Sequence, residues 1–179
     1  MMLRSGIVYV IALTICMLRF QGSIYAEKPL DLKELGSYRY TYNFLLSVYD
    51  ITLYSTIPNS SEKLLSGNVP FELQFKYLRD IEKNDFIKVS NRMLEKNLSA
   101  QDISAMSDQI KSLHSAYRLV RKGDTSILRY TPSKGTTLII NGIEIIQLPG
   151  KLMCQYFRIW LGEDPISLQM RDAIIGFNH

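Results

Sequence analysis

Residues Phe71–Tyr77, with the sequence FELQFKY, decide the fold because apolar and polar side chains alternate along them without a break. Successive side chains of a strand point to opposite faces, so the apolar residues share one face and the polar residues the other. A strand of this kind buries one face and leaves the other in water. The segment therefore predicts an antiparallel sheet with a single covered face.

The preceding segment has the same alternation. Residues 38–48 place tyrosine and other apolar residues at every second position and predict a strand. The phase then reverses, because Tyr49, Ile51 and Leu53 are apolar and the residues between them are polar. A β-bulge or a sharp bend reverses the phase in this way. We therefore expect the sheet to turn at Tyr49.

A connecting loop and two helices are expected around the central strand. Residues 58–69 (PNSSEKLLSGNV) are rich in serine, asparagine and glycine and predict the loop. Helical periodicity begins behind Asn84, which is expected to be an N-cap. A second helix is expected to start at Ser99, where Ser99 and Asp102 resemble a capping box.

Strands return in the second half of the chain. Residues 126–131 and 137–140 have strand composition, and residues 143–146 continue the pattern. Asn141-Gly142 separates the last two segments, and both residues tolerate positive φ. The pair therefore predicts a type I′ hairpin.

The C-terminal segment predicts two more helices. Residues 151–161 (KLMCQYFRIWL) are apolar on most of the helix circumference, so this helix is expected to lie deep against the sheet and to end at Gly162 as the C′ residue. Asp164-Pro165 are expected to open the last helix, and Gly176 to stop it. Antiparallel hairpins with helices collected on one face predict an α+β layer architecture.

The N-terminus predicts export. Residues 1–26 are expected to be a signal peptide that is removed from a domain spanning residues 27–179. The apolar run at residues 7–18 follows an arginine and is shorter than the roughly 20 residues that span a bilayer. We favour cleavage after Ala26 over cleavage after Ser23, and cleavage over an uncleaved anchor. The mature protein is then expected in the periplasm or cell envelope, without a transmembrane span.

Charge and cysteine content limit the partners and the chemistry. Removing residues 1–26 takes away two arginines and no acids, so the net charge falls from +4 to +2. Arg118, Arg121 and Lys122 form the only local basic excess, which is expected to be a solvated loop, and we expect no nucleic-acid partner. Cys154 is left without a partner cysteine and is expected to be a buried, inert thiol.

No cofactor or metal site is expected. His114 and His179 are the two histidines, and their spacing to the cysteine does not match a set of metal ligands. Neither a phosphate-binding glycine loop nor a nucleophile elbow is present. Asp80, Glu82 and Asp85 cluster where a strand leads into a helix, and acids there are expected to favour the helix N-terminus.

The remaining unusual feature is Arg39 within the tyrosine-rich strand. Aromatic rings can wall an apolar cleft while a guanidinium binds a carboxylate or a phenolate through two hydrogen bonds. The alternative is an ordinary strand with its aromatic rings in the core and Arg39 in water. The residues alone favour this alternative, because strands are enriched in aromatic residues in any case.

Four segments in order resemble the bacterial chalcone isomerase-like family. They are Val48–Tyr54 (VYDITLY), Pro70–Asp85 (PFELQFKYLRDIEKND), Lys122–Thr131 (KGDTSILRYT) with Asn141-Gly142, and Ile159–Gly176 (IWLGEDPISLQMRDAIIG). YLRDI and IWLGE are the most distinctive, and together the segments span nearly the whole mature chain. The resemblance implies an open-faced β-sandwich, in which a large antiparallel sheet is backed by a helical layer.

The resemblance also implies where an isomerase site would lie. Plant chalcone isomerases bind the substrate phenolate with an arginine and polarise its ketone with threonine, tyrosine, lysine and asparagine side chains. Here Phe44 replaces the strand threonine, and Asp85-Phe86 stand where the tyrosine is expected. Lys88 can take the place of the lysine, and Arg92 or Asn91 that of the asparagine.

A further hydroxyl position near the C-terminal DPIS falls on Ile166 or Ser167. Loss of a preorganised donor commonly costs about 10²- to 10³-fold in rate, so the missing tyrosine and threonine argue against efficient cyclisation.

The family also includes fatty-acid-binding members that hold a carboxylate with arginine and tyrosine over an apolar pocket. We therefore expect a non-catalytic protein that binds a fatty acid or another amphipathic metabolite. Arg39, Tyr42 and Tyr49 are the expected head-group residues, and Lys88 is expected in the same site. Two alternatives remain open: an isomerase of the chalcone isomerase type, and a protein-interaction module without a ligand.

Overall fold

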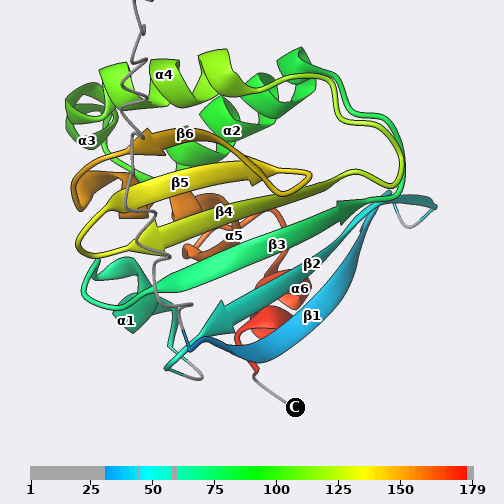
Figure 1. Ribbon diagram of the computed structural model, residues 1–179, viewed down its shortest axis with the longest axis horizontal. Helices are drawn as coiled ribbons and strands as arrows, with labels where there is room; N and C mark the ends of the chain where they lie inside the picture. The colour runs from blue at the N-terminus through cyan, green and yellow to red at the C-terminus, as the bar shows by residue number, and fades with distance from the viewer. Residues whose placement is uncertain (1–30, 44, 58–59, 177–179) are drawn as a thin grey trace, which may run out of the picture.

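The computed structural model describes residues 31–43, 45–57 and 60–176, and in this part of the chain six strands form one antiparallel sheet (Figure 1). The strands are β1 (Lys33–Tyr42), β2 (Leu46–Ser55), β3 (Phe71–Tyr77), β4 (Thr125–Thr131), β5 (Gly135–Ile140) and β6 (Ile143–Leu148). Their order across the sheet is their order along the chain, so every strand pairs with its sequence neighbours. The α+β class predicted from the sequence is confirmed.

The helices lie behind the sheet and beyond its β6 edge in the view of Figure 1. They are α1 (Ser61–Leu65), α2 (Lys83–Asn97), α3 (Ala100–Ala105), α4 (Ser107–Ala116), the 3-10 helix η1 (Leu152–Phe157), α5 (Arg158–Leu161) and α6 (Leu168–Ile174). Helix α6 packs on β1 and β2, η1 on β5 and α4 on β6. None of these helices covers the other face of the sheet, which makes the architecture open-faced.

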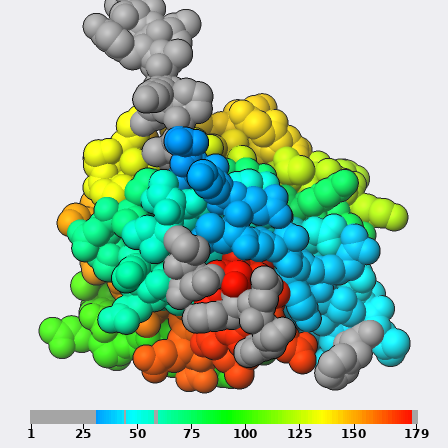
Figure 2. All heavy atoms as spheres, turned by 90° about the horizontal axis from the view of Figure 1, so that it is seen from below, coloured from blue at the N-terminus to red at the C-terminus, as the bar shows by residue number. Residues whose placement is uncertain are grey.

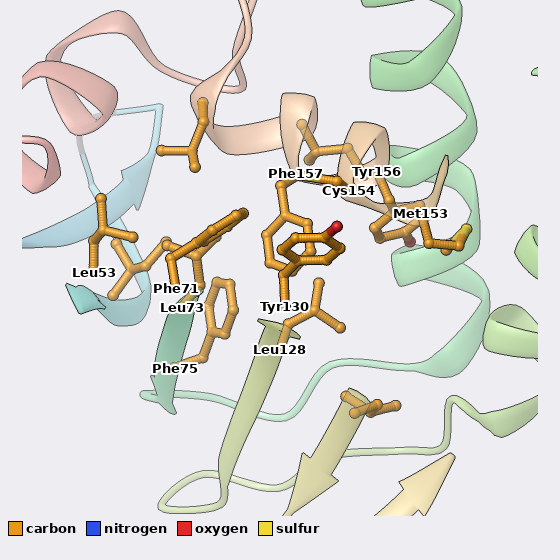
Figure 3. Close-up of a cluster of buried hydrophobic side chains, with 14 of the residues drawn as sticks. Leu53, Phe71, Leu73, Phe75, Leu128, Tyr130, Met153, Cys154, Tyr156 and Phe157 are labelled. Carbon is orange, nitrogen blue, oxygen red and sulfur yellow. The ribbon is translucent and has the colours of Figure 1, made fainter. Parts of the chain in front are cut away.

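The core lies between the sheet and this helical layer (Figure 3). Phe71 of β3 contacts Tyr130 of the paired strand β4 and Phe157 of η1, with ring centroids 5.7 and 4.6 Å apart. All three side chains are fully buried. The Tyr130 hydroxyl donates a hydrogen bond of 2.9 Å to the Gly67 carbonyl, so its polar end is satisfied inside the core.

Several local predictions are confirmed. Strand β3 is the FELQFKY segment, and its four apolar residues are buried as predicted. On the other face Lys76 is exposed, but Glu72 is buried in an ion pair with Arg129. Asn141 and Gly142 have φ of 49° and 77° and join β5 to β6, as a type I′ hairpin requires. The Ser99 hydroxyl accepts a hydrogen bond of 3.1 Å from the Asp102 amide at the start of α3. These signals are local, which is why the sequence predicts them.

The phase change before Tyr49 is a β-bulge, as predicted. Tyr40 pairs with Tyr49, and the next residue of β1, Thr41, pairs with Ser47. Val48 is therefore an extra residue on β2 opposite β1. A bulge increases the local twist of a strand pair, so it bends this edge of the sheet.

The prediction of one continuous strand over residues 38–48 is wrong. The chain reverses between β1 and β2: Asn43 has φ of 49°, and the Leu45 amide donates a hydrogen bond of 3.3 Å to the Tyr42 carbonyl. Asparagine tolerates the left-handed region better than most residues, so it can end a strand without a glycine. Phe44 lies outside the described residues. The alternation simply continues through the turn, which hides the hairpin from a periodicity analysis.

Other boundaries also differ from the predictions. Helix α2 begins at Lys83 behind Glu82, so Asn84 lies inside the helix and is not its N-cap. The expected loop over residues 58–69 contains α1, which begins behind Ser60 and buries Leu64 and Leu65; residues 58 and 59 lie outside the described part. The expected second helix is divided into α3 and α4 at Met106, whose φ of −98° departs from helical values.

The C-terminal helices also differ in detail. The segment from residue 151 to 161 begins as the 3-10 helix η1, and Gly162 has φ of −73°, so it is not a left-handed C′ residue. A Cβ atom at Gly162 would instead collide with the Asn97 side chain and the Arg158 carbonyl. Helix α6 begins behind Ser167, whose hydroxyl accepts from the Met170 amide at 3.2 Å, rather than at Asp164-Pro165.

The predicted signal peptide and the start of the mature domain, residues 1–26 and 27–30, lie outside the described residues. Within the part of the chain that is described, no helix is both long enough and apolar enough to cross a bilayer.

Helix α6 and strand β1 lie side by side at one edge of the molecule (Figure 2). Their approach depends on Gly36, because a Cβ atom there would collide with the Ala173 carbonyl and lie 3.1 Å from the Ile174 Cα. Both contacts are with backbone atoms, which cannot rotate away as a side chain can. Gly36 therefore sets how closely α6 covers the sheet.

We expect Gly36→Ala to lower the free energy of unfolding by about 1–3 kcal/mol, because the added methyl group overpacks this contact. Urea denaturation followed by circular dichroism measures the change. Ser37→Ala, at an exposed neighbouring position on β1, is the matched control and should change stability by less than about 0.5 kcal/mol. Equal midpoints for the two variants would contradict the prediction.

Candidate functional site

A cavity of about 470 Å³ lies between the covered face of the sheet and the helices α2 and α5. This volume is within the range of about 300–1,000 Å³ found for small-molecule pockets. Most of the wall is apolar. Its aliphatic and aromatic side chains include Val48, Phe75, Leu128, Leu138, Ile140 and Trp160.

The bulge on β2 places a pair of tyrosines in the cavity wall. Tyr40 and Tyr49 are paired across β1 and β2, and their rings stack with centroids 5.2 Å apart. Tyr49 also meets Phe75 edge to face, at 5.4 Å. Burial raises the pKa of the Tyr49 hydroxyl far above its usual value, and the hydroxyl donates to the Met170 sulfur at 3.9 Å. Tyr49 therefore remains protonated.

A first hydroxyl pair lies on the strands that form the floor of the cavity. The Tyr77 hydroxyl of β3 and the Ser126 hydroxyl of β4 are 2.8 Å apart, and both residues line the cavity. Burial raises the pKa of the Tyr77 hydroxyl to about 12. The pair is therefore neutral, and its two hydroxyl groups satisfy each other.

A second cluster of hydroxyl groups lies against α2. The Tyr156 hydroxyl donates to Ser90 at 2.8 Å, lies 2.8 Å from the Tyr117 hydroxyl, and lies 3.4 Å from Nε2 of His114. Burial raises the pKa of Tyr156 to about 12 and lowers the pKa of His114. Ser90 and Tyr117 line the cavity, and the other two residues are not among its lining residues. These hydroxyls are neutral and bound to one another, so they form polar points on an otherwise apolar surface.

Charged residues are confined to the mouth of the cavity, where all six are exposed. The cations are Arg79, Lys88, Arg92 and Arg118, and the acids are Asp80 and Asp85. Lys88 and Arg92 lie one turn apart on α2. Burial raises the pKa of Tyr40, and the charge of Arg92 opposes this rise. Within the described residues, none of the four cations has a carboxylate within 4 Å.

The structure brings three of the four predicted site residues to this cavity. Tyr49 lies in the wall, Lys88 lies at the mouth on α2, and Tyr42, with 54% of its surface exposed, lies at the mouth on β1. Their contact with a ligand remains a prediction.

Arg39 lies on the other face of the sheet. Its Nε and Nη2 donate to the two carboxylate oxygens of Asp50 at 2.7 and 3.0 Å, and its side chain is 61% exposed. This pairing corrects the expectation that Arg39 holds a ligand head group. The reason is the strand alternation: Tyr40 faces the cavity, so its neighbour Arg39 must face away. The alternation in the sequence already places Arg39 on the face opposite Tyr40 and Tyr42.

Positions assigned through the family resemblance do meet at the cavity. Phe86, Lys88 and Arg92 of α2 line it, and so does Ile166. Sequence reasoning missed the hydroxyl groups of Tyr77, Ser90, Tyr117 and Ser126. The alternation of β3 places Tyr77 on the covered face, but its partner Ser126 is set by the pairing of β3 with β4, which no local pattern reveals.

No nucleophile or metal centre stands out in the described residues. Cys154 is buried, its thiol donates to the Leu64 carbonyl at 3.3 Å, and burial raises the pKa of the thiol to about 12. The prediction that Cys154 is buried is confirmed, and its raised pKa agrees with an inert thiol. In the same part of the chain, no three His, Cys, Asp or Glu side chains come together as metal ligands.

Comparison with known proteins agrees with this architecture. The sequence profile of a family described as chalcone isomerase-like matches residues 21–176. Among solved structures, the fold is similar to that of a fatty-acid binding protein of Arabidopsis thaliana, with a TM-score of 0.64 and 15% sequence identity over 86% of this chain and 94% of that protein. At this identity the likeness concerns the fold. No curated protein sequence matches the chain significantly.

Proposed function

Since the chain belongs to the chalcone isomerase-like family, we propose that its cavity binds a fatty acid or a similar amphipathic acid without converting it. The observation that carries this proposal is an apolar cavity of about 470 Å³ whose charged lining residues, four cations and two acids, are all exposed at its mouth. That division matches a molecule with a long apolar tail and one anionic end. The plant protein of similar fold is a fatty-acid binding protein, which supports the choice of ligand.

The tail accounts for most of the binding free energy in this proposal. Each methylene group moved from water to an apolar site contributes about 0.8 kcal/mol. Aliphatic walls such as Leu138 and Ile140 and flat rings such as Trp160 contact a flexible chain without requiring a fixed shape. The buried hydroxyl groups already satisfy one another, so they demand no matching polar group on the tail.

The head group is assigned to Lys88 and Arg92. Both line the mouth, lie on one face of α2 and are free of carboxylates within the described residues. A carboxylate between them gains two charge-assisted contacts while staying partly in water, which avoids the cost of burying a charge. Tyr42, also at the mouth, can donate a hydrogen bond to the same carboxylate.

Binding suits the cavity better than cyclisation does. Polarising a ketone requires donors that are aimed at it before the reaction begins. Phe86 and Ile166 line the cavity at positions where the resemblance calls for hydroxyl groups, and neither can donate a hydrogen bond. Of the tyrosine hydroxyls that are present, those of Tyr77 and Tyr117 are bound to other side chains, and burial raises their pKa values.

The assignment of the apolar tail to the cavity predicts that the affinity for a fatty acid rises with the length of its acyl chain. Trp160 is the single tryptophan of the chain and lines the cavity, so energy transfer from Trp160 to bound cis-parinaric acid reports occupancy. Displacement by saturated acids from octanoic to palmitic acid should improve about fourfold per methylene until the cavity is filled. The proposal would be contradicted if displacement did not depend on the length of the acyl chain, or if no energy transfer from Trp160 were seen.

The head-group assignment predicts that the double variant Lys88→Gln/Arg92→Gln binds palmitic acid about 3- to 30-fold more weakly, or by ~0.7–2 kcal/mol. The loss is moderate because both charges lie in partly solvated positions. The methyl ester should bind the variant and the unchanged protein alike. Arg39→Gln is the matched control, since its guanidinium lies on the other face of the sheet, and it should leave the affinity unchanged. Equal loss in the control and the test variant would contradict the assignment.

We also propose that residues 1–26 direct export and are then removed, which rests on the sequence pattern at the N-terminus. Expression of the full chain in a Gram-negative host should yield a periplasmic protein that starts at Glu27, or at Ile24 if cleavage follows Ser23. Intact-mass measurement of the periplasmic fraction gives the N-terminus. A protein that keeps all of its residues and stays in the cytoplasm would refute this proposal.

A further inference from the structure

Exposed apolar side chains gather at the tip of the β1–β2 hairpin. Leu45 is 92% exposed, Tyr42 54% and Leu46 45%. Tyr42 and Leu46 also line the cavity, so the tip forms one side of its mouth. Single exposed apolar residues are ordinary, but a group of large ones at one projecting turn marks an interaction site.

Two loops continue this surface. The Leu78 amide donates to the Val48 carbonyl at 2.9 Å, which joins the loop of residues 78–82 to the start of β2. Ile81 and Val120 form a β-bridge, which joins that loop to the loop of residues 117–124. Figure 1 shows the hairpin tip and both loops at the same end of the sheet, on the right. Leu119, on the second loop, is 37% exposed.

The apolar tip is flanked by basic side chains. They are exposed and come from the two loops and from α2: Arg79, Lys88, Arg92, Arg118, Arg121 and Lys122. The loops and the start of α2 also carry four acids, namely Asp80, Glu82, Asp85 and Asp124. Two of these accept hydrogen bonds from loop amides: Asp80 from Lys122 and Asp124 from Arg121, both at 2.8 Å. The surface therefore keeps a positive excess around exposed apolar groups.

We propose that this surface, consisting of Tyr42, Leu45 and Leu46 at the hairpin tip and the basic side chains around them, docks on a bilayer that contains anionic phospholipids. Lysine and arginine near such a bilayer each contribute about 1 kcal/mol. Apolar side chains at a projecting tip add to this by entering the boundary between head groups and acyl chains. The combination of a basic ring and an apolar tip complements a lipid surface in both charge and polarity.

Docking in this orientation turns the mouth of the cavity toward the lipid. Tyr42 and Leu46 belong both to the docking surface and to the cavity lining, so the entrance and the contact with lipid coincide. An amphipathic molecule could then pass between the bilayer and the cavity without exposing its tail to water. The docking itself rests on the exposed tip and its charges, and it holds whichever molecule the cavity binds.

Flotation of the purified protein with vesicles tests the docking. Vesicles of an equimolar mixture of phosphatidylcholine and phosphatidylglycerol should bind the protein, and vesicles of phosphatidylcholine alone should bind it much more weakly. Binding should fall as salt is raised, because exposed charges are screened. We expect Leu45→Ser to reduce binding about tenfold, and Arg79→Gln/Arg118→Gln to reduce it about 30-fold.

Matched controls lie outside the proposed docking surface. Leu152→Ser alters a leucine that is 40% exposed on η1, which packs against α1, and Lys63→Gln/Lys111→Gln removes two exposed charges from α1 and α4. Both should bind vesicles as the unchanged protein does. If Leu45→Ser unfolds at the same temperature as the unchanged protein, its loss of vesicle binding is not caused by loss of the fold.

Leu45 is not among the residues that line the cavity, so Leu45→Ser should still take up cis-parinaric acid in solution. Loss of vesicle binding with retained uptake separates the docking surface from the ligand site. Equal binding to both kinds of vesicle, or equal effects of Leu45→Ser and Leu152→Ser, would overturn the proposal. The proposal would also be overturned if this surface bound another protein and the purified protein did not bind vesicles.

Discussion

The bulge at Val48 is the constraint on which the cavity depends. It inserts one residue into β2 opposite the pair of Tyr40 and Thr41, so the alternation of β2 changes phase in the middle of the strand. Beyond the bulge, Tyr49 faces the helices and stacks on Tyr40, while Asp50 faces the open side and pairs with Arg39. One extra residue thus separates an aromatic wall from an ion pair. The added twist bends this edge of the sheet, and the side chains on both sides of the bulge line the cavity.

Inside the cavity, polar groups are satisfied before any ligand arrives. The lining residues Tyr77 and Ser126 hydrogen-bond to each other, and the lining residue Ser90 accepts from Tyr156 behind the wall, in surroundings where burial keeps the tyrosines protonated. Charges are found at the mouth, where water can solvate them. An interior of this kind stabilises apolar groups and offers little to a reaction that develops charge. The same fold can therefore serve binding or catalysis, depending on which side chains are aimed into one hollow.

The mouth and the hairpin tip belong to the same stretch of chain. The turn that reverses the chain after Tyr42 carries Leu45 into solvent, and the strand that follows returns Leu46 to the edge of the cavity. Basic residues of α2 and of the loop before β4 lie around it, including the run Arg118, Arg121 and Lys122, which the sequence alone predicts to be a solvated loop. The same basic residues suit a solvated loop or the proposed lipid-facing surface. Only the exposed apolar residues of the neighbouring hairpin tip favour the second.

The sequence by itself determined the local elements: the strand at Phe71–Tyr77, the hairpin at Asn141-Gly142 and the bulge before Tyr49. Each depends on residues that are close in the chain, so periodicity and backbone preferences are sufficient. The α+β class follows from the order of such elements along the chain. Tertiary structure decided which face each residue meets. The turn at Asn43 was hidden by an alternation that continues through it, and the hydroxyl pair of Tyr77 and Ser126 exists only because β3 lies beside β4. Arg39 faces away from the cavity because Tyr40 faces into it, and the cavity itself is formed by segments distant in sequence, whose packing no local pattern encodes.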